Sequence, residues 1–403
     1  MSDDLHDYRQ RLRSWLADNI DRYEGEDPDL GADISPERVA QARRIQAKLY
    51  DAGYAGFTFP KEYGGQGLTP DHERVYLEEV VGYHVPTRLF GVSINILGAT
   101  VAEFGTHEQK ARHVPRILRG EELWLQLLSE PGGGSDLAGL LMSAVRDGDN
   151  YVVNGQKIWS SGAHFADFAI CPVRTDWNVP KHKGISVLIV DLRAPGVEVR
   201  RIKQVNGEAH FCEEFFTDVL VPASNLIGEE NEGWRVLRGL LAIEHAWVGR
   251  GGAKRPDFRQ DVNDMVALAK AQGLADDVGV RRRVTDLHVG LQVQRWTSDR
   301  VSRAVAHHGF HHDYGSLLKL GNDDLSLRGG ELGLALAGAD GLTWDLADNA
   351  GGAWAHAYLT SRSAPIGGGT TEILRNNVSE KVLGLPREQS VDRDVPFNQV
   401  PHN

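Results

Sequence analysis

The sequence predicts an α+β protein in which a β-rich middle region separates two helical regions. Residues 1–122 carry apolar side chains at helical spacing, and residues 233–387 show the same spacing. Between them, residues 123–232 hold short apolar or alternating runs at close spacing, which are typical of a small barrel or sandwich. Residues 388–403 form a polar tail with spaced prolines, which we expect to be loose.

The N-terminal region is expected to begin with a helix in LHDYRQRLRSWLADNI, because Leu5, Leu12 and Leu16 fall on one face. A second helix is expected to begin after Ser35, which suits the N-cap position, with Pro36 as its first residue. The stretch FPKEYGGQGLTP, rich in glycine with a proline at each end, predicts a turn between helices.

The middle region offers several strands in succession. In YVVNGQKIW, the dipeptide Asn154–Gly155 separates two short runs and predicts a β-hairpin turn. GISVLIVDL is a continuous apolar strand, VEVRRIKQV alternates, and EEFFTDVLVP follows. Strands this short and this close together favour a small barrel or a sandwich.

The C-terminal region is expected to be helical again. WRVLRGLLAIEHAWVGR has an apolar stripe at 3.6-residue spacing, and further helices are expected near 258–272, 278–308 and 314–337. The stretch Trp344–Trp354 is rich in Ala, Asp and Gly and is interpreted as a loop, and Glu372–Leu383 is the last clear helix.

Composition limits the partners of this chain. The formal net charge is −12 with a pI near 5.7, which argues against non-specific nucleic-acid binding because that needs a basic face. Cys171 and Cys212 lack metal-ligand spacing and are interpreted as buried thiols in a reducing compartment. The charged N-terminus is no signal peptide, and no apolar run approaches the length of a membrane span. We expect a cytoplasmic protein without membrane or nucleic-acid partners.

Glu244 is the first candidate for chemistry. On a helix it shares an apolar stripe with Leu237, Leu240, Leu241 and Val248. Burying a lone carboxylate is costly, so such a group is either paired with a cation or has a raised pKa. A raised pKa suits a general base, whereas an arginine partner would make the residue structural.

Two segments of the middle region suit a ligand. LSEPGGGSD supplies the hydroxyls of Ser129 and Ser135, with glycines that permit close backbone approach, although an ordinary loop has the same composition. In NGQKIWSSG, Trp159 precedes Ser160 and Ser161, so an indole and hydroxyls could hold a flat aromatic ligand, unless the tryptophan belongs to the core.

Two further patterns have weaker interpretations. His307, His308, His311 and His312 form i,i+4 pairs that could bind a metal, but no acidic residue completes a site, so we favour a polar helix end and predict no metal. PIGGGTTEILRN places glycines and threonines before a helix, which resembles a phosphate cradle but lacks the lysine of a phosphate-binding loop.

Taken in order, these segments resemble the acyl-CoA dehydrogenase family over most of the chain. FPKEYGGQGLTP, FGTHEQKARHVPRILRGE, LSEPGGGSD, NGQKIWSSG, KHKGISVLIVD, FFTDVLVPASNLIGEENEGW and GGGTTEILRN are each similar to a family segment. The resemblance implies a helical N-domain, a middle β-barrel and a C-terminal four-helix bundle. It also implies FAD, and oxidation of an acyl-CoA thioester at the α,β bond: a carboxylate removes the α-proton and the β-hydride passes to the flavin. Electrons would leave to an electron-transfer flavoprotein, and the assembly would be a dimer of dimers.

The resemblance also implies roles for residues at matching positions. Contacts to FAD are expected from Gln126, Leu128, Ser129, Trp159, Ser160, Ser161, Thr370 and Glu372. Contacts to the acyl-CoA are expected from Ser135, Gly368, Gly369 and His245. Serine replaces the family's usual threonine at positions 129 and 161, which keeps the hydroxyl.

The closing loop departs from the common family pattern. Many members carry the catalytic glutamate just before the Gly–Thr of this loop, where this chain has Gly368. A second branch, which resembles isovaleryl and long-chain enzymes, carries the base on a helix of the C-domain at the position of Glu244. The resemblance therefore favours Glu244 as the base. The arginine that usually follows it is His245 here.

Two FAD-contacting motifs are eroded. The family's Arg–x–x–Phe–Gly has no clear match between Gly251 and Arg283, and the segment Leu334–Gly341 reads LALAGADG without the usual glutamine. This pattern resembles heteromeric members in which a homologous subunit supplies the missing contacts, several of which act on steroid side-chain CoA esters. The alternatives are a non-catalytic subunit that completes a partner's FAD site, or the same fold acting on a carrier-protein thioester or a nitroalkane.

Overall fold

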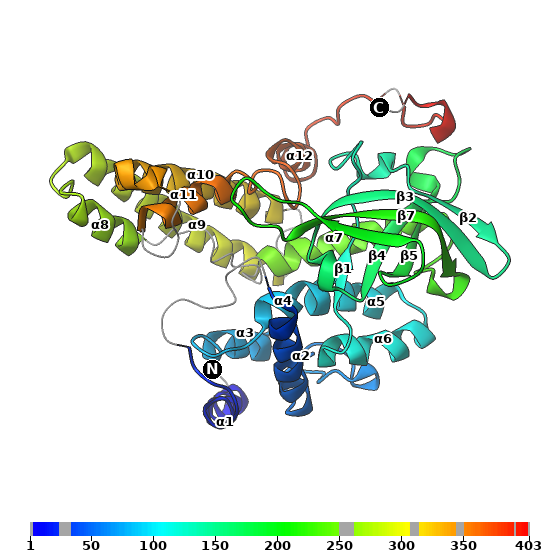
Figure 1. Ribbon diagram of the computed structural model, residues 1–403, viewed down its shortest axis with the longest axis horizontal. Coiled ribbons are helices and arrows are strands. Elements are labelled where there is room, and N and C mark those ends of the chain that lie inside the picture. The colour runs from blue at the N-terminus through cyan, green and yellow to red at the C-terminus, as the bar shows by residue number, and fades with distance from the viewer. Residues whose placement is uncertain are drawn as a thin grey trace. The chain divides into compact units, whose positions relative to one another are not determined.

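The computed structural model describes residues 3–23, 34–249, 262–306, 314–343, 350–390 and 392–401 (Figure 1). The chain divides into two compact units. The first comprises Met1–Gln204, Glu208–Glu244 and Ser390–Asn403, and the second comprises Val205–Gly207 and His245–Gln389. Within the described ranges, no helix combines the length and the apolar character needed to cross a membrane.

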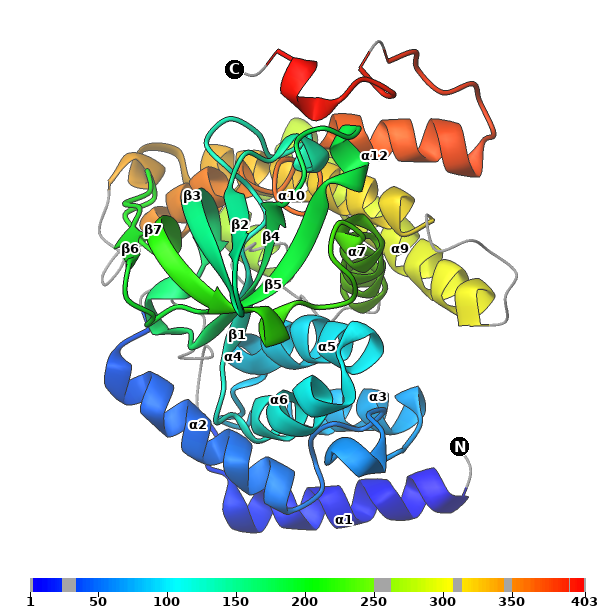
Figure 2. The same cartoon turned by 90° about the vertical axis from the view of Figure 1, so that its right-hand side faces the viewer.

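The first unit begins with a group of helices, which Figure 2 shows gathered on one side of the strands. Leu12 and Leu16 are fully buried, so the apolar face predicted for the first helix is confirmed. The Ser35 hydroxyl accepts a hydrogen bond from the Arg38 backbone N–H at 3.4 Å, which confirms the predicted N-cap. The helices are α1 (Asp3–Asn19), α2 (Pro36–Asp51), α3 (Pro70–Glu79), α4 (Thr87–Val92), α5 (Ala99–Phe104) and α6 (His107–Arg119).

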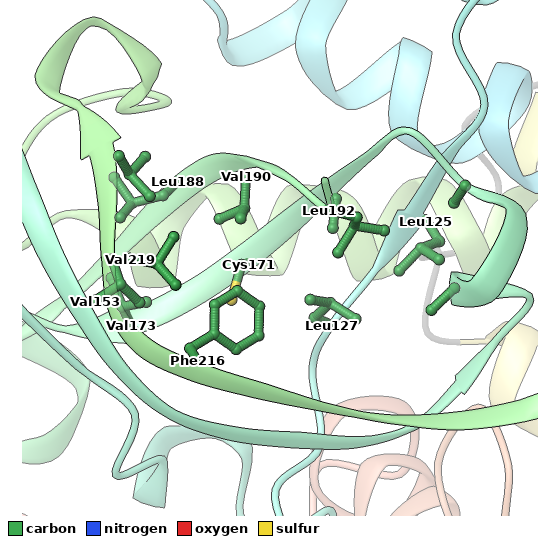
Figure 3. Close-up of a cluster of buried hydrophobic side chains, with 14 of the residues drawn as sticks. Leu125, Leu127, Val153, Cys171, Val173, Leu188, Val190, Leu192, Phe216 and Val219 are labelled. Carbon is green, nitrogen blue, oxygen red and sulfur yellow. The ribbon is translucent and has the colours of Figure 1, made fainter. Parts of the chain in front are cut away.

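The strands of the first unit form one seven-stranded sheet in the order β1-β4-β2-β3-β7-β6, with β5 paired to β4. The sheet curls around a hydrophobic cluster that includes Cys171, Val190 and Phe216 (Figure 3). Burying this inner face is what the predicted barrel requires. The strands are β1 (Trp124–Gln126), β2 (Ser143–Asp147), β3 (Asn150–Ser161), β4 (Phe168–Arg174), β5 (Ile185–Asp191), β6 (Val197–Arg201) and β7 (Phe211–Pro222).

The hairpin turn predicted at Asn154–Gly155 is wrong, because β3 runs straight through these residues. They form a bulge instead, because the pairing with β7 shifts here. The Asn154 side-chain amide donates to the Asp218 carboxylate, and its oxygen accepts from the backbone N–H of Asp218. A Cβ on Gly155 would lie 2.9 Å from the Cα of Met142, so the glycine permits close approach of β2. The turn lies at Gly148, where φ is 55° and β2 joins β3.

The second unit is helical. Helices α8 (Val262–Ala271), α9 (Val278–Ala306), α10 (Gly315–Ala337) and α11 (Ala350–Ser361) share one hydrophobic cluster and lie alongside one another in Figure 1. Helix α7 (Gly233–Gly249) precedes them and begins in the first unit, and α12 (Thr371–Asn377) follows, extended by a π-helical turn over Val378–Val382. The expected helices of this region are therefore confirmed where the structure describes them.

The loop predicted over Trp344–Trp354 is wrong from Ala350 onward, where α11 begins. Residues 344–349 lie outside the described part of the chain. Trp354 is 2% exposed and packs on α10, where a Cβ on Gly333 would lie 1.9 Å from its ring. Tertiary packing of one large ring on a glycine overrides the loop-like composition of this segment.

The C-terminal tail was predicted to be loose, which is wrong for residues 392–401. Phe397 is 1% exposed, and its ring lies 3.9 Å below the guanidinium carbon of Arg174. Its backbone N–H donates to the carbonyl of Val179 at 2.9 Å. The Lys181 ammonium lies 3.1 Å from Asp392. The tail is thus part of the first unit, held there by one buried ring and an ion pair.

Candidate functional site

The end of β3 presents a tryptophan outward. The pairing between β3 and β7 shifts between Ile158 and Ser160, which leaves Trp159 in a bulge. Trp159 has φ 67°, a rare conformation for a bulky residue, and its side chain is 56% exposed. Its ring meets the edge of Phe211 at a centroid distance of 6.0 Å. The strained bulge therefore exposes the indole, so of the two positions considered from the sequence, core or ligand contact, Trp159 does not occupy the core.

The two serines after Trp159 have different surroundings. Ser160 is buried, and its hydroxyl donates to the Glu214 carboxylate inside the sheet. Ser161 is exposed at the end of β3. Of the two hydroxyls, only that of Ser161 is therefore accessible to a ligand beside the indole, whereas that of Ser160 is engaged in the interior.

The chain after β1 runs beside this bulge. The Ile158 backbone N–H donates to the carbonyl of Ser129 at 3.0 Å, and the Lys157 ammonium donates to the carbonyl of Leu128 at 3.4 Å. Leu128 and Ser129 therefore lie next to the residue that precedes Trp159. Two of the segments singled out by sequence, the loop LSEPGGGSD and the strand NGQKIW with its exposed indole, therefore meet at this place.

A buried ion pair closes the LSEPGGGSD loop. The Lys157 ammonium is fully buried and lies 2.9 Å from Glu130. The same carboxylate accepts from the backbone N–H groups of Leu141 at 2.6 Å and Met142 at 3.0 Å, so one side chain ties the start of the loop to the residues just before β2. Ser135 lies between Glu130 and Leu141 in the chain and is exposed.

Glu244 lies on α7, half-buried, and receives a side-chain hydrogen bond from β1. The Gln126 amide nitrogen donates to its carboxylate at 3.3 Å, and Leu237 and Leu240 of the predicted stripe are fully buried. The other end of the Gln126 amide, Oε1, is buried and has no hydrogen-bond partner among the described residues. A buried acceptor without a donor is costly, so this oxygen suits a donor from a ligand.

The closing loop belongs to the second unit. Gly368 and Gly369 have φ of 69° and 94°, which only glycine adopts readily, so the backbone can follow a tight path here. Thr370 caps α12 by accepting from the Ile373 backbone N–H at 3.3 Å. Glu372 is exposed in the first turn, where its own backbone N–H lowers the pKa of its carboxyl.

His245 follows Glu244 on α7 and is assigned to the second unit. Its Cβ lies 3.7 Å from the position that a Cβ on Gly315 would occupy, at the start of α10. The predicted site residues thus fall into two groups. Gln126, Leu128, Ser129, Ser135, Trp159, Ser160, Ser161 and Glu244 belong to the first unit, and His245, Gly368, Gly369, Thr370 and Glu372 belong to the second.

Sequence reasoning missed the interior charges behind the bulge, those of Lys157, Glu130 and Glu214. One signal was present for Glu214: in a strand, adjacent residues face opposite sides, so one carboxylate of the pair Glu213–Glu214 had to face inward. Lys157 and Glu130 are 27 positions apart, and nothing in the local pattern joins them.

Other sequence interpretations have plain outcomes. Cys171 and Cys212 are free and buried, as predicted. His307, His308, His311 and His312 lie outside the described residues, as do residues 250–261 of the region searched for the Arg–x–x–Phe–Gly motif. In the part of the chain that the structure describes, no three His, Cys, Asp or Glu side chains are grouped as metal ligands would be.

Comparisons with known proteins identify the family to which this fold belongs. Models of the acyl-CoA dehydrogenase N-terminal, middle and C-terminal domains match residues 2–121, 126–219 and 231–383. The chain belongs to the acyl-CoA dehydrogenase family. Members of this family are flavoproteins, typically with FAD.

Several relatives are similar over almost their whole length. Acyl-CoA dehydrogenase IpdE1 of Mycobacterium tuberculosis is 35% identical, over 96% of this chain and 99% of that protein. A solved structure described as the Tcur3481-Tcur3483 steroid ACAD has a TM-score of 0.79 and 30% identity, over 96% of this chain and 99% of that one. The ChsE4-ChsE5 complex from Mycobacterium tuberculosis has a TM-score of 0.72 and 28% identity, with the same coverage of both chains.

Proposed function

We propose that this chain is a catalytic subunit of a FAD-dependent acyl-CoA dehydrogenase, with Glu244 as the base that removes the α-proton. The observation that carries the proposal is the hydrogen bond from the Gln126 amide to the Glu244 carboxylate at 3.3 Å. This bond links the half-buried carboxylate on α7 to β1. Three residues after Gln126, Ser129 accepts a hydrogen bond from Ile158, which precedes Trp159 in the bulge. The proposed base on α7 thus contacts β1, a strand of the sheet that carries the indole.

The proton step needs a carboxylate held in one orientation beside the thioester. The Gln126 amide can hold the Glu244 carboxylate in one orientation by donating to its Oε2. Fixing the base in advance avoids reorganisation when the proton moves. The backbone N–H of Gly368 is a candidate donor to the thioester oxygen, where negative charge develops as the α-proton leaves.

The residues present in the first unit fit a flavin. The exposed Trp159 indole would pack on one face of the ring system, and the Ser161 hydroxyl and the backbone at Leu128 and Ser129 would contact its edge. The unpartnered Gln126 Oε1 would accept a hydrogen bond from an N–H donor of the ligand. When bound, FAD accepts the β-hydride. Thr370 and Glu372 of the second unit are proposed as further FAD contacts.

The proposed substrate is the CoA thioester of a bulky, steroid-like acid. One similar structure is described as a steroid ACAD with two named components, and another as a complex of two named chains. The loss of FAD-contacting motifs from Leu334–Gly341 supports the same assembly, in which a homologous partner supplies the missing contacts. An electron-transfer flavoprotein is the proposed acceptor. His245, Ser135 and Gly369 are proposed as substrate contacts.

The catalytic role is tested with Glu244→Gln in the assembled complex. We expect kcat to fall by about 10²- to 10⁴-fold, because the amide cannot accept the proton, with flavin content unchanged. Glu229→Gln, which changes an exposed carboxylate shortly before α7, is the matched control and should behave like wild type. Unchanged dehydrogenation by Glu244→Gln would remove this chain from catalysis and favour the non-catalytic subunit.

Assembly and substrate need separate measurements. Co-purification from the native source with flavin quantitation is expected to recover a homologous partner. If the chain purified alone forms a homotetramer with one FAD per protomer, the heteromeric part of the proposal is wrong. A screen of CoA esters, carrier-protein thioesters and nitroalkanes with an artificial electron acceptor separates the remaining chemistries, and turnover only of CoA esters is expected.

A further inference from the structure

A carboxylate inside the sheet lies directly behind the Trp159 bulge. Glu214 of β7 faces inward with Cys212 and Phe216 and is fully buried. Its Oε1 accepts a hydrogen bond from the Ser160 hydroxyl. Its Oε2 is also buried and has no hydrogen-bond partner among the described residues. Glu214 therefore has one strong contact in the interior, and that contact is to the residue that follows Trp159.

The charges around Glu214 do not balance when it is ionised. Lys157 lies opposite Glu214 in the pairing of β3 with β7, but its ammonium is bound to Glu130 at 2.9 Å. One buried lysine thus faces two carboxyl groups. Burial raises the pKa of Glu214 to about 7, the Ser160 hydrogen bond and the Lys157 charge oppose this rise, and the nearby Glu213 carboxylate adds to it.

The bulge needs something to hold it. A left-handed conformation is unfavourable for a residue other than glycine, so Trp159 at φ 67° is stable only if its neighbours fix it. On the outer side, its ring contacts the edge of Phe211. On the inner side, the Ser160 hydroxyl is held by Glu214. Both contacts come from β7, one on each face of the strand.

We propose that Glu214 is a positioning residue that holds the Trp159 bulge in its outward conformation through the Ser160 hydroxyl. The use of the indole as a wall of the flavin site rests on the proposed function. The contact itself does not, because it exists within the first unit of this chain alone.

This contact should depend on pH. A protonated Glu214 is neutral and still accepts the hydrogen bond from Ser160 through Oε1, whereas an ionised Glu214 adds an uncompensated charge beside Lys157 and Glu130. Burial also raises the pKa of Cys171 to about 12, so that thiol stays neutral through the physiological range. The titratable groups around Glu214 are Lys157 on β3, Cys171 on β4, Cys212 and Glu213 on β7, and Glu130 after β1.

The test follows the Trp159 ring itself. The chain is produced with 5-fluorotryptophan, its Trp159 ¹⁹F resonance is assigned by its loss in Trp159→Phe, and the resonance is followed from about pH 5.5 to about pH 8.5. In the wild-type chain we expect a titration centred near pH 7. In Glu214→Gln, which is permanently neutral, the resonance should stay at the wild-type low-pH position.

Two matched variants separate the contact from general effects. Glu213→Gln removes the neighbouring carboxylate, whose Oε2 accepts from Gln156 at 3.2 Å, and should keep the titration with a lower midpoint, since Glu213 contributes to the raised pKa of Glu214. Ser160→Ala keeps Glu214 but removes the hydroxyl. In this variant the pH-dependent change in the Trp159 ¹⁹F chemical shift should be only a small fraction of the wild-type change.

Clear outcomes would overturn the inference. The inference is wrong if the Trp159 resonance of the wild-type chain does not move with pH. A titration that persists in full in Glu214→Gln would assign the effect to a group other than Glu214 and would equally overturn the inference. Neither result bears on Glu244, and loss of activity in Glu244→Gln does not depend on the ¹⁹F measurement, so the two proposals fail separately.

Discussion

The buried carboxyl of Glu214 should make the first unit less stable as the pH rises. Its pKa is raised from the ordinary value of 4.5 to about 7, mainly by burial, so the folded chain binds this proton more tightly than the unfolded chain does. The free energy of unfolding is therefore unaffected by this group well below pH 4.5. It falls as the pH rises from 4.5 towards 7, and the loss is complete above pH 7.

The size of the effect follows from the same values. Each tenfold change in proton affinity corresponds to about 1.4 kcal/mol. A pKa raised from 4.5 to about 7 therefore costs the folded state about 3 kcal/mol at pH 8, as an order of magnitude. Glu214→Gln cannot ionise and avoids this cost. The variant should match wild type within about 1 kcal/mol at pH 5 and be about 3 kcal/mol more stable at pH 8.

The assay is urea unfolding of both chains at pH 5 and pH 8, monitored by circular dichroism. The comparison of variant with wild type at each pH removes the contributions of all other titrating groups. Glu213→Gln removes a carboxylate that adds to the raised pKa of Glu214, so it should stabilise the chain at pH 8 relative to pH 5 by less than Glu214→Gln does. The reasoning is refuted if the difference between Glu214→Gln and wild type is the same at both pH values, or if the variant is the less stable chain at pH 8.

Three further variants test other contacts. Lys157→Met leaves Glu130 buried without its cation and should cost about 3–5 kcal/mol in the same unfolding assay; a loss below 1 kcal/mol would contradict the ion pair's role. Phe397→Ala empties the site under Arg174 and should cost about 3–5 kcal/mol, measured as a lower urea midpoint, whereas a loose tail would give no change. Gln126→Leu removes the donor to Glu244 and should lower kcat of the assembled complex about tenfold with little change in KM; an unchanged kcat would exclude a positioning role.

Much of the fold could be predicted because its elements have regular periods. The apolar spacing of α1, the cap at Ser35 and the inward stripe of Leu237 and Leu240 are local patterns, and each is confirmed. The hairpin shows the limit of such reasoning. Asn154–Gly155 and Gly148–Asp149 both have the composition of a two-residue turn, and only the pairing of β3 with β2 and β7 decides which of them forms the turn and which forms a bulge.

The site was predictable in part for the same reason. Periodicity placed Glu244 on an apolar face, and the family resemblance singled out Trp159, but neither revealed the Gln126 amide beside that carboxylate. The Lys157–Glu130 pair, the Ser160–Glu214 contact and the burial of Phe397 each join residues distant in sequence. Charge and burial are decided by such long-range contacts, so a single sequence leaves them open.

The packing of the tail on the sheet has a consequence for synthesis. Residues 392–401 follow the whole second unit along the chain, yet Phe397 and Asp392 complete contacts of Arg174 and Lys181 in the first. While the ribosome is still making α8 to α12, the guanidinium of Arg174 has no ring to cover it. Most of the first unit is therefore translated before the second unit, but its contacts with residues 392–401 can form only after the second unit has been translated.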